Sequence, residues 1–321
     1  MKSHADLRGL RQYLPFEGVL AGDPHMGNFG VIPLSEVGGR RKMVFVNLDF
    51  DDAGRGPFVL DFIRYVIASK AVNQQIKRRS LERGYIEGLI GRTMKSPRKV
   101  QDSLDIRVSD YDDMVAEYAD KHSSKHGFRL APGEIQTYDA KVQRSTIAGL
   151  FAEESVVDLA IRPEDRGGSA GQLRIWVLLT GKQSRRRIVE LKQFAKPAIA
   201  QYCDQPAVQP WLKAIREAFW PGLDSSAYDL VELSPHGFFW IREKRVPLID
   251  VPYSSAKPGE VEFVNELAIY DANQLGLAHG RQAQAATFRA AIEKDTDAFH
   301  QATEPVEDAY LAAARQALGV M

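Results

Sequence analysis

The chain has 321 residues, of which 44% are hydrophobic and 26% charged, as in an ordinary globular protein. Its 42 Lys and Arg residues balance 42 Asp and Glu residues, which argues against bulk electrostatic binding to nucleic acid or to an anionic membrane. The single cysteine, Cys203, excludes an internal disulfide and favours a reducing, cytoplasmic setting. Residues 1–13 lack the apolar core of a signal peptide, and no stretch approaches the ~20 apolar residues of a membrane span.

The first part of the chain predicts mixed α and β structure. Residues 16–50 have the pattern of short strands separated by polar turns. Residues 58–72 carry apolar side chains at helical spacing, and 74–94 and 109–122 are further helix candidates. Ser96 and Pro97 indicate a break between the last two.

The pattern changes near residue 155, where strands dominate. We expect strands at 156–162, 173–180, 187–194, 228–233 and 237–243. One helix, at 206–219, interrupts them, which predicts a small antiparallel sheet carrying one helix. After a loop at 251–259, helices are expected at 261–279 and within 285–318.

Two polar turns carry residue types suited to phosphate chemistry. In the turn 22–28, Asp23 could accept the proton of an attacking hydroxyl, and Asn28 could hold a divalent cation. Asp49 and Asp51 end an apolar strand, where carboxylates are costly unless they are solvated or bind a cation. Magnesium prefers one or two carboxylates plus substrate phosphates. Either turn alone favours ordinary side-chain-to-backbone hydrogen bonds, whereas the pair favours a metal–phosphate site.

A glycine-rich segment lies between two of the expected strands. Gly168, Ser169 and Gly171 could let backbone amides approach phosphates closely. Lys192, at the end of the next strand, could pair with those phosphates. Taken by itself, this segment favours a flexible hairpin and a surface lysine.

The two turns resemble the catalytic and metal-binding segments of aminoglycoside-phosphotransferase-like enzymes, which have the protein-kinase fold. More closely, the chain resembles the bacterial domain-of-unknown-function family 2252, a family with no established reaction. The segments that carry this resemblance are 22–30, 47–52, 56–64, 168–171, 191–192, 240–243 and 277–279.

The resemblance implies a kinase-like fold and a role for each matching residue. It implies that Asp23 is the catalytic base and that Asn28 and Asp49 are metal ligands, with Asp51 as a possible extra ligand. It implies that Lys192 pairs with phosphates.

Three further residues are expected to support the site. Asp61 is expected to brace the catalytic turn. His25 is expected to have a structural or supporting role, and Arg242 is expected to reach the cleft.

The chain departs from the family patterns at several positions. Ala21 stands where phosphotransferases usually carry histidine, and Gln193 follows Lys192 where the family tends to have glutamate. The partner glutamate of Lys192 is not identified by the sequence, and Glu217 is a guess.

The order of the parts predicts a circular permutation. In ordinary kinases the glycine loop and lysine precede the catalytic turn, whereas here they follow it. We therefore predict a two-lobed α+β kinase-like fold. Residues 1–150 and 251–321 would form the catalytic lobe, and residues 151–250 would form the nucleotide-binding lobe.

The preferred function is ATP- and magnesium-dependent phosphoryl transfer to a hydroxyl of a small molecule. The alternative is a catalytically inactive kinase-like protein that binds a nucleotide or a partner.

A metallophosphoesterase would need a Gly-Asn-His turn, which the sequence lacks. Asp49 and Asp51 also match a glycosyltransferase-type metal motif that is common by chance, and a calcium loop starting at Asp49 has Leu60 at its twelfth position instead of glutamate. The acceptor and the oligomeric state are not identified by the sequence.

Overall fold

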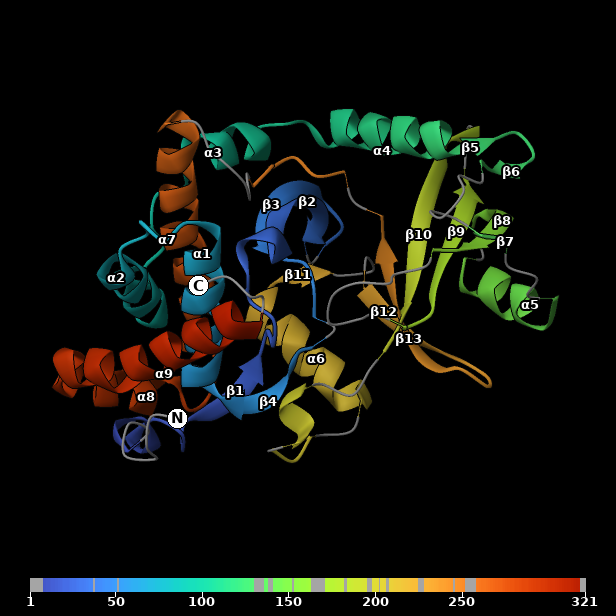
Figure 1. The fold of residues 1–321 in the computed structure, drawn as a ribbon. Coiled ribbons are helices and arrows are strands. Elements are labelled where there is room, and N and C mark those ends of the chain that lie inside the picture. Colours follow the sequence, from blue (N-terminus) through green and yellow to red (C-terminus); the bar gives the residue numbers. More distant parts are fainter. Residues whose placement is uncertain are drawn as a thin grey trace.

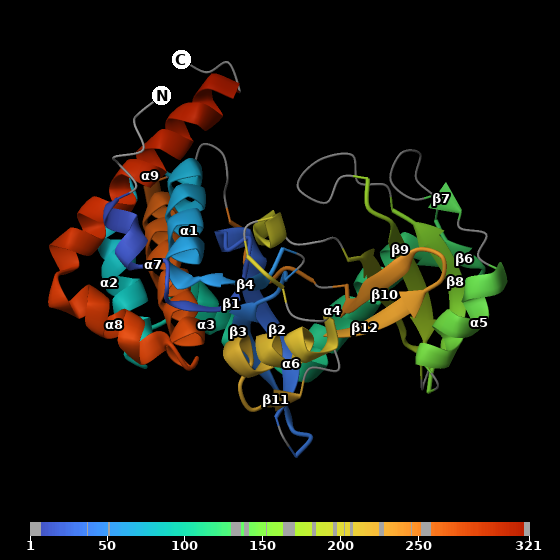
Figure 2. The same ribbon diagram turned by 90° about the horizontal axis from the view of Figure 1, so that it is seen from below.

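The computed structural model has a mainly helical half and a half built around one antiparallel sheet, which lie side by side (Figure 1 and Figure 2). This confirms the expected mixture of helices with an antiparallel sheet. The structure describes residues 8–36, 38–50, 52–129, 136–137, 141–151, 153–162, 171–181, 184–194, 198–201, 203–205, 208–224, 228–244, 246–251 and 258–317.

The helical elements lie close to the positions expected from the sequence, with two additions. The α-helices are α1 (Phe58–Val72), α2 (Arg78–Leu89), α3 (Arg98–Leu104), α4 (Val108–His122), α5 (Lys141–Leu150), α6 (Val208–Phe219), α7 (Pro258–Gly280), α8 (Ala285–Lys294) and α9 (Thr296–Ala317). Short 3-10 helices are η2 (Gly9–Gln12), η3 (Met26–Asn28) and η5 (Ala198–Gln201). The additions are α3, which begins directly after Pro97, and α5.

The strands form one large sheet and three small ones. They are β1 (Glu17–Leu20), β2 (Phe29–Glu36), β3 (Arg41–Asn47), β4 (Gly54–Pro57), β5 (Ser123–Ser124), β6 (Gly127–Phe128), β7 (Gln136–Thr137), β8 (Ser155–Ile161), β9 (Arg174–Thr180), β10 (Arg186–Gln193), β11 (Leu223–Asp224), β12 (Tyr228–Leu233) and β13 (Gly237–Glu243). The large sheet has the order β12-β13-β10-β9-β8-β7, and all of its neighbours are antiparallel. Its five long strands are those expected from the sequence.

Alternation along β10 gives the large sheet two different faces. Val189 and Leu191 lie in an apolar cluster that includes Ile147 of α5, so this face is closed by α5. Glu190 and Lys192 alternate with them and occupy the opposite face. Lys192 lies 3.8 Å from Asp49, so the polar end of this second face is directed at the helical half.

The apolar end of the second face is covered by α4. Ile188 and Trp176 of the sheet share a buried cluster with Ala119 of α4. Arg185 and Arg186 pair with Asp113 and Asp120 of α4 at 2.9 and 3.0 Å. Part of the arginine run at 185–187 thus ties the sheet to a helix.

The position of α6 differs from the expectation that the sheet carries this helix. Leu212, Ile215 and Phe219 are buried in the core of the helical half. The Phe219 ring lies 5.0 Å from the Phe50 ring, centroid to centroid. Spacing of three and four residues gives α6 one apolar face, and the core beside β1 and α7 buries it.

Segments from both ends of the chain build the core of the helical half. Rings from the start and the end of the chain pack together, with centroids 5.0 Å apart for Tyr13 and Phe299 and 5.6 Å apart for Phe58 and Phe288. In the described part of the chain, no helix has the combined length and apolarity that crossing a bilayer requires.

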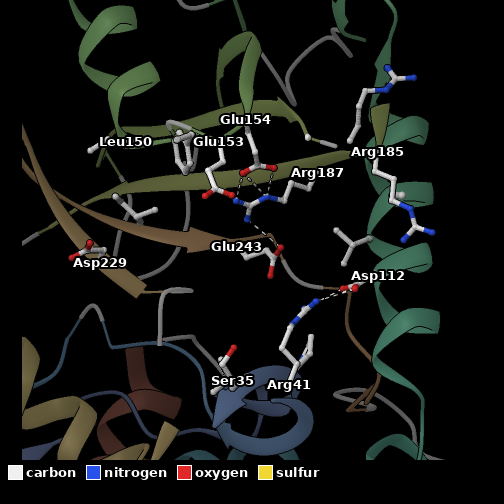
Figure 3. Close-up of a pocket in the computed structure, with 18 residues that line it drawn as sticks. Ser35, Arg41, Asp112, Leu150, Glu153, Glu154, Arg185, Arg187, Asp229 and Glu243 are labelled. Atoms are coloured by element: carbon white, nitrogen blue, oxygen red, sulfur yellow. Dashed lines mark hydrogen bonds and ion pairs between the residues drawn. The ribbon is translucent and has the colours of Figure 1, made fainter. Parts of the chain in front are cut away.

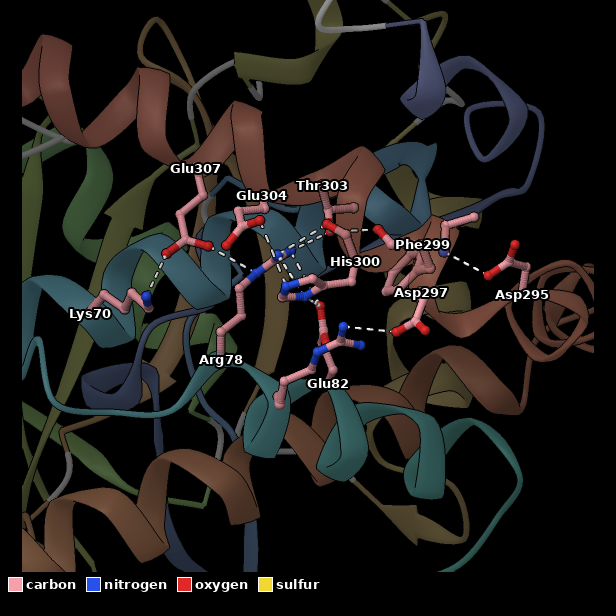
Figure 4. A network of polar contacts seen from close by, with 12 residues as sticks. Lys70, Arg78, Glu82, Asp295, Asp297, Phe299, His300, Thr303, Glu304 and Glu307 are labelled. Atoms are coloured by element: carbon pink, nitrogen blue, oxygen red, sulfur yellow. Dashed lines mark hydrogen bonds and ion pairs between the residues drawn. The ribbon is translucent and has the colours of Figure 1, made fainter.

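A buried network of charges joins α1, α2 and α9 (Figure 4). Arg78 lies 3.0 Å from Glu307 and 3.4 Å from Glu82, measured between nitrogen and carboxylate oxygen, and all three residues are almost fully buried. Lys70 of α1 also pairs with Glu307, at 3.2 Å, and His300 contacts Glu82 at 2.8 Å. Arg78 therefore neutralises carboxylates that have little access to water.

We expect Arg78→Met to destabilise the protein by about 3–5 kcal/mol, because it leaves buried carboxylates without their cation. The free energy of unfolding in urea measures this loss. Arg79→Met is the matched control, since Arg79 is 52% exposed and its ion pairs should contribute less than about 1 kcal/mol. Equal losses for the two variants would contradict a stabilising role for the network.

Asp271, on α7, is a fully buried acid. Among the described residues, neither of its carboxyl oxygens has a hydrogen-bond partner. Burial disfavours the charged form and raises the pKa of Asp271 well above its ordinary value of 3.8. As the pH rises through 3.8, the unfolded chain ionises while the folded carboxyl stays protonated, so the folded state loses stability.

We expect Asp271→Asn to gain stability over the natural protein as the pH is raised from about 4 to about 7.5. The gain should approach about 1.4 kcal/mol for each unit by which burial raises the pKa, within that pH range. Urea unfolding of both proteins at several pH values measures the difference. If the difference in free energy of unfolding between the two proteins does not change with pH, Asp271 is ionised in the folded state and the expectation is contradicted.

Candidate functional site

The turn after β1 is held by Asp61, a buried residue of α1. The backbone N–H groups of Ala21 and Gly22 donate to the two carboxylate oxygens of Asp61, at 2.6 and 3.0 Å. Asp61 thus makes the contacts expected of a brace for this turn. Because Asp61 lies in the first turn of α1, it ties the loop to this helix.

A histidine from the other end of the chain completes this brace. His279 of α7 lies with Nε2 3.2 Å from Oδ2 of Asp61, and its Nδ1 lies 2.7 Å from the hydroxyl of Tyr85. All three side chains are buried. Ala21 stands where phosphotransferases usually carry histidine, and the contact of His279 with Asp61 joins residues 218 positions apart, for which the sequence near either residue gives no signal.

Gly22 allows the two polar turns to touch. Its φ is +83°, and a Cβ built there would lie 1.8 Å from the carbonyl oxygen of Asp52 in the second turn. Only glycine fits such a close approach of two backbones. The backbone hydrogen bond from Leu48 to Asn28, at 2.7 Å, adds a second link between the turns.

Asp23 and Asn28 lie at opposite ends of the first turn and contact each other. The Asn28 side-chain amide donates to the Asp23 carbonyl at 2.8 Å, which fixes the direction of its Oδ1. The Asp23 carboxylate is 54% exposed and lies 3.6 Å from Arg64 and 3.8 Å from His25. His25 also accepts a hydrogen bond from Gly27 at 3.1 Å, consistent with a supporting role in the turn.

Asp49 follows β3 and meets two cations of the sheet half. Its Oδ2 lies 3.1 Å from Nη1 of Arg242 and 3.8 Å from Nζ of Lys192. Its backbone N–H donates to Asn47 at 3.1 Å, which shapes the turn. The expected meeting of Lys192 with the acidic turn is therefore present, whereas Asp51 lies outside the described residues.

Glu190, which is not among the site residues expected from the sequence, holds Arg242 in place. Arg242 Nε donates to Glu190 Oε1 at 2.7 Å, and Trp176 Nε1 donates to Oε2 at 3.0 Å. Glu190 is only 1% exposed. Because Glu190 and Lys192 are two residues apart on β10, strand alternation could have placed them on the same face.

The charge of Glu190 is stabilised by its neighbours. Burial raises the pKa of this carboxyl, but the charges of Arg242, Lys244 and Arg174 and the bond from Trp176 outweigh it, bringing the pKa to about 2. This lowered pKa makes Glu190 stabilising above pH 4.5, and the contribution is lost as the pH falls towards 2.

Glu217 is not the partner of Lys192. It lies on α6, is 68% exposed and pairs with Lys213 at 3.8 Å. The guess was wrong because α6 packs its apolar face on the helical half and leaves Glu217 in solvent.

The described part of the glycine segment is Gly171, which precedes β9 with φ +80°. This left-handed conformation favours glycine. Gly168 and Ser169 lie outside the described residues.

A cavity of about 260 Å³ adjoins the ion pairs. It is bordered by the first turn at Gly27, by Leu48 and by Arg242. Phe29, Val31, Val246, Leu248 and Ile249 give it apolar walls, and the charged residues Glu243 and Lys244 also line it.

A larger cavity, of about 810 Å³, lies at the opposite end of β10 (Figure 3). Among its charged groups, Arg187 pairs with Glu154 and Glu243, and Arg41 pairs with Asp112. None of the expected site residues is among the residues that line it.

Asn28 and Asp49 are oxygen donors that suit a magnesium ion shared with phosphates. Within the described ranges, no three His, Cys, Asp or Glu side chains gather as a metal cluster. Magnesium does not need such a cluster, since it keeps several waters and uses phosphate oxygens. The donor set therefore fits magnesium bound together with a phosphate ligand.

We expect Gly22→Ala to destabilise the protein by about 3 kcal/mol or more, because it adds a backbone clash to an unfavourable φ. Gly237→Ala is the matched control, since Gly237 has the same φ of +83° but open space at its Cβ position. The control should lose about 1 kcal/mol. Thermal unfolding compares the two, and similar losses would contradict the direct contact between the turns.

The comparisons with known proteins bear on the first quarter of the chain. Residues 4–80 match the model of the family described as "Uncharacterized protein conserved in bacteria (DUF2252)". Neither a curated protein nor a solved structure matches the chain. The matched segment contains both polar turns and Asp61, so over these residues the chain is similar to this bacterial family.

Proposed function

We propose that the protein transfers the terminal phosphoryl group of magnesium-bound ATP to a hydroxyl of a small molecule. The observation that carries this proposal is the meeting of Lys192 and Arg242 with Asp49 across the two halves. Two cations beside one carboxylate suit a phosphate chain and its metal, because each charge then has a partner when the ligand is bound.

In this proposal Asn28 Oδ1 and the Asp49 carboxylate hold the magnesium ion. Bound there, the ion would neutralise charge on the phosphates. The amide nitrogen of Asn28 already donates to Asp23, which leaves its Oδ1 as the atom suited to a cation. Lys192 and Arg242 steady the phosphate oxygens.

The neighbouring cavity of about 260 Å³ suits a planar base. Its apolar walls come from β2 and from the segment after β13, and Arg242 stands at its border. A nucleotide could therefore place its base against these walls and its phosphates against the cations.

Asp23 is the group that acts on the acceptor. Its exposed carboxylate takes the proton of the acceptor hydroxyl while that oxygen forms a bond to the terminal phosphorus. The bond from this phosphorus to the bridging oxygen breaks, and ADP leaves with the electron pair. Arg64, 3.6 Å away, orients the Asp23 carboxylate.

The arrangement of the sheet supports the finer proposal of a circularly permuted kinase-like fold. The glycine-containing segment joins β8 and β9, and Lys192 lies on β10, the next strand. Protein kinases likewise place a glycine-rich loop before the lysine of their third strand. In the permuted chain, residues 151–250 supply most of the nucleotide side, while both ends supply the catalytic turns.

One observation favours the alternative of an inactive nucleotide- or partner-binding protein. The buried carboxylate nearest in sequence to Lys192 is Glu190, and it is engaged by Arg242 and Trp176. Kinases position their lysine with a dedicated glutamate. If Lys192 is held differently, binding could persist without turnover.

Thermal unfolding with and without magnesium and ATP, followed by a phosphoryl-transfer assay over a set of hydroxyl compounds, tests the proposal. We expect Asp49→Asn to lose the magnesium-dependent rise in Tm. We expect Asp23→Asn to keep that rise but to lose transfer by about 100-fold or more. Asp112→Asn is the control, because Asp112 pairs with Arg41 at the larger cavity. This variant should keep both the magnesium-dependent rise in Tm and the transfer activity.

Each variant is compared with its own ligand-free Tm, so that a loss of stability is not mistaken for a loss of binding. A natural protein whose Tm does not respond to magnesium and ATP would contradict the proposal. Binding without transfer, unaffected by Asp23→Asn, would support the inactive alternative.

A further inference from the structure

Three cationic residues stand side by side across three strands of the large sheet. Lys192 on β10 is in register with Arg174 on β9. Arg162 directly follows β8, and its backbone N–H donates to the Arg174 carbonyl at 3.0 Å. Neighbouring strands lie about 4.8 Å apart, so this row, here called the cation ladder, spans about 10 Å.

The ladder occupies the face of the sheet that carries Glu190. The Arg162 guanidinium lies over the Trp176 ring at 4.9 Å, and Trp176 bonds to Glu190. Arg174 is among the charges that lower the pKa of Glu190. Lys192 lies 3.8 Å from Asp49, so one end of the ladder is at the candidate metal site.

Positive charge is concentrated around the ladder. Arg242 contacts Asp49, and Lys244 lies over the Trp176 ring at 5.3 Å. Like charges opposite each other on neighbouring strands destabilise a sheet. A row of three cations spaced along a line matches a ligand whose negative charges are spaced in the same way.

We propose, building on the proposed function, that the cation ladder binds a linear chain of three or more phosphates laid across the strands. One phosphate lies at Lys192 beside Asp49, and the chain continues to Arg174 and Arg162. Arginine suits this role because its planar group forms paired hydrogen bonds with phosphate oxygens. Nucleoside triphosphates and inorganic polyphosphate share this chemistry.

Calorimetric titration in the presence of magnesium tests the ladder with pyrophosphate, tripolyphosphate and ATP as separate probes. The natural protein should bind tripolyphosphate at least about 10-fold more tightly than pyrophosphate, because the longer chain reaches more cations. Arg174→Gln and Arg162→Gln should each weaken tripolyphosphate binding by about 10-fold and change pyrophosphate binding far less.

Arg185→Gln is the matched control, because Arg185 lies near the other end of β10, is 54% exposed and pairs with Asp113. It should bind all three probes as the natural protein does. Arg174→Lys, which keeps the charge, should bind tripolyphosphate more tightly than Arg174→Gln. It also provides a second measurement if Arg174→Gln fails to fold.

The outcomes separate the ladder from the proposed function. Unchanged tripolyphosphate affinity in Arg162→Gln and Arg174→Gln, with ATP binding intact, overturns the ladder alone. Ladder-dependent binding of tripolyphosphate without ATP binding or transfer overturns the proposed function and indicates an inorganic polyphosphate ligand. A natural protein that binds none of the probes overturns both.

Discussion

The candidate site depends on one arrangement of charges, in which the Asp49 carboxylate of the helical half is shared by Lys192 and Arg242 of the sheet half. Lys192 is almost fully buried and Arg242 is 9% exposed, so these cations have little water to replace a lost partner. Glu190 accepts a hydrogen bond from Nε of Arg242. Removing one member of such a buried group leaves a charge uncompensated. This group fixes how the acidic turns face the sheet.

The acidic turns can meet the cations of the sheet half only because the helical half holds these turns in position. Asp61 of α1 accepts hydrogen bonds from two backbone N–H groups of the first turn, and His279 of α7 contacts Asp61. These two helices come from opposite ends of the chain. Gly22 lets that turn rest directly on the second one. Positioning of this kind, set before any ligand arrives, is what phosphoryl transfer needs most from a protein.

Local structure was predictable where periodicity was strong, as in α1, whose bounds match the expected helix at 58–72. Long-range partners were harder to predict. The apolar face of α6 indicated burial but did not identify the surface that covers it, so Glu217 was assigned wrongly. Alternation on β10 could have revealed Glu190, whereas the contact between His279 and Asp61 joins residues from opposite ends of the chain and has no local signal.

The most direct test is a crystal structure of the protein with manganese in place of magnesium and a non-hydrolysable ATP analogue. The account predicts an anomalous peak at Asn28 Oδ1 and the Asp49 carboxylate, with analogue phosphate oxygens within hydrogen-bonding distance of Lys192. A metal peak away from both side chains, with the analogue bound outside the space between the two halves, would contradict it.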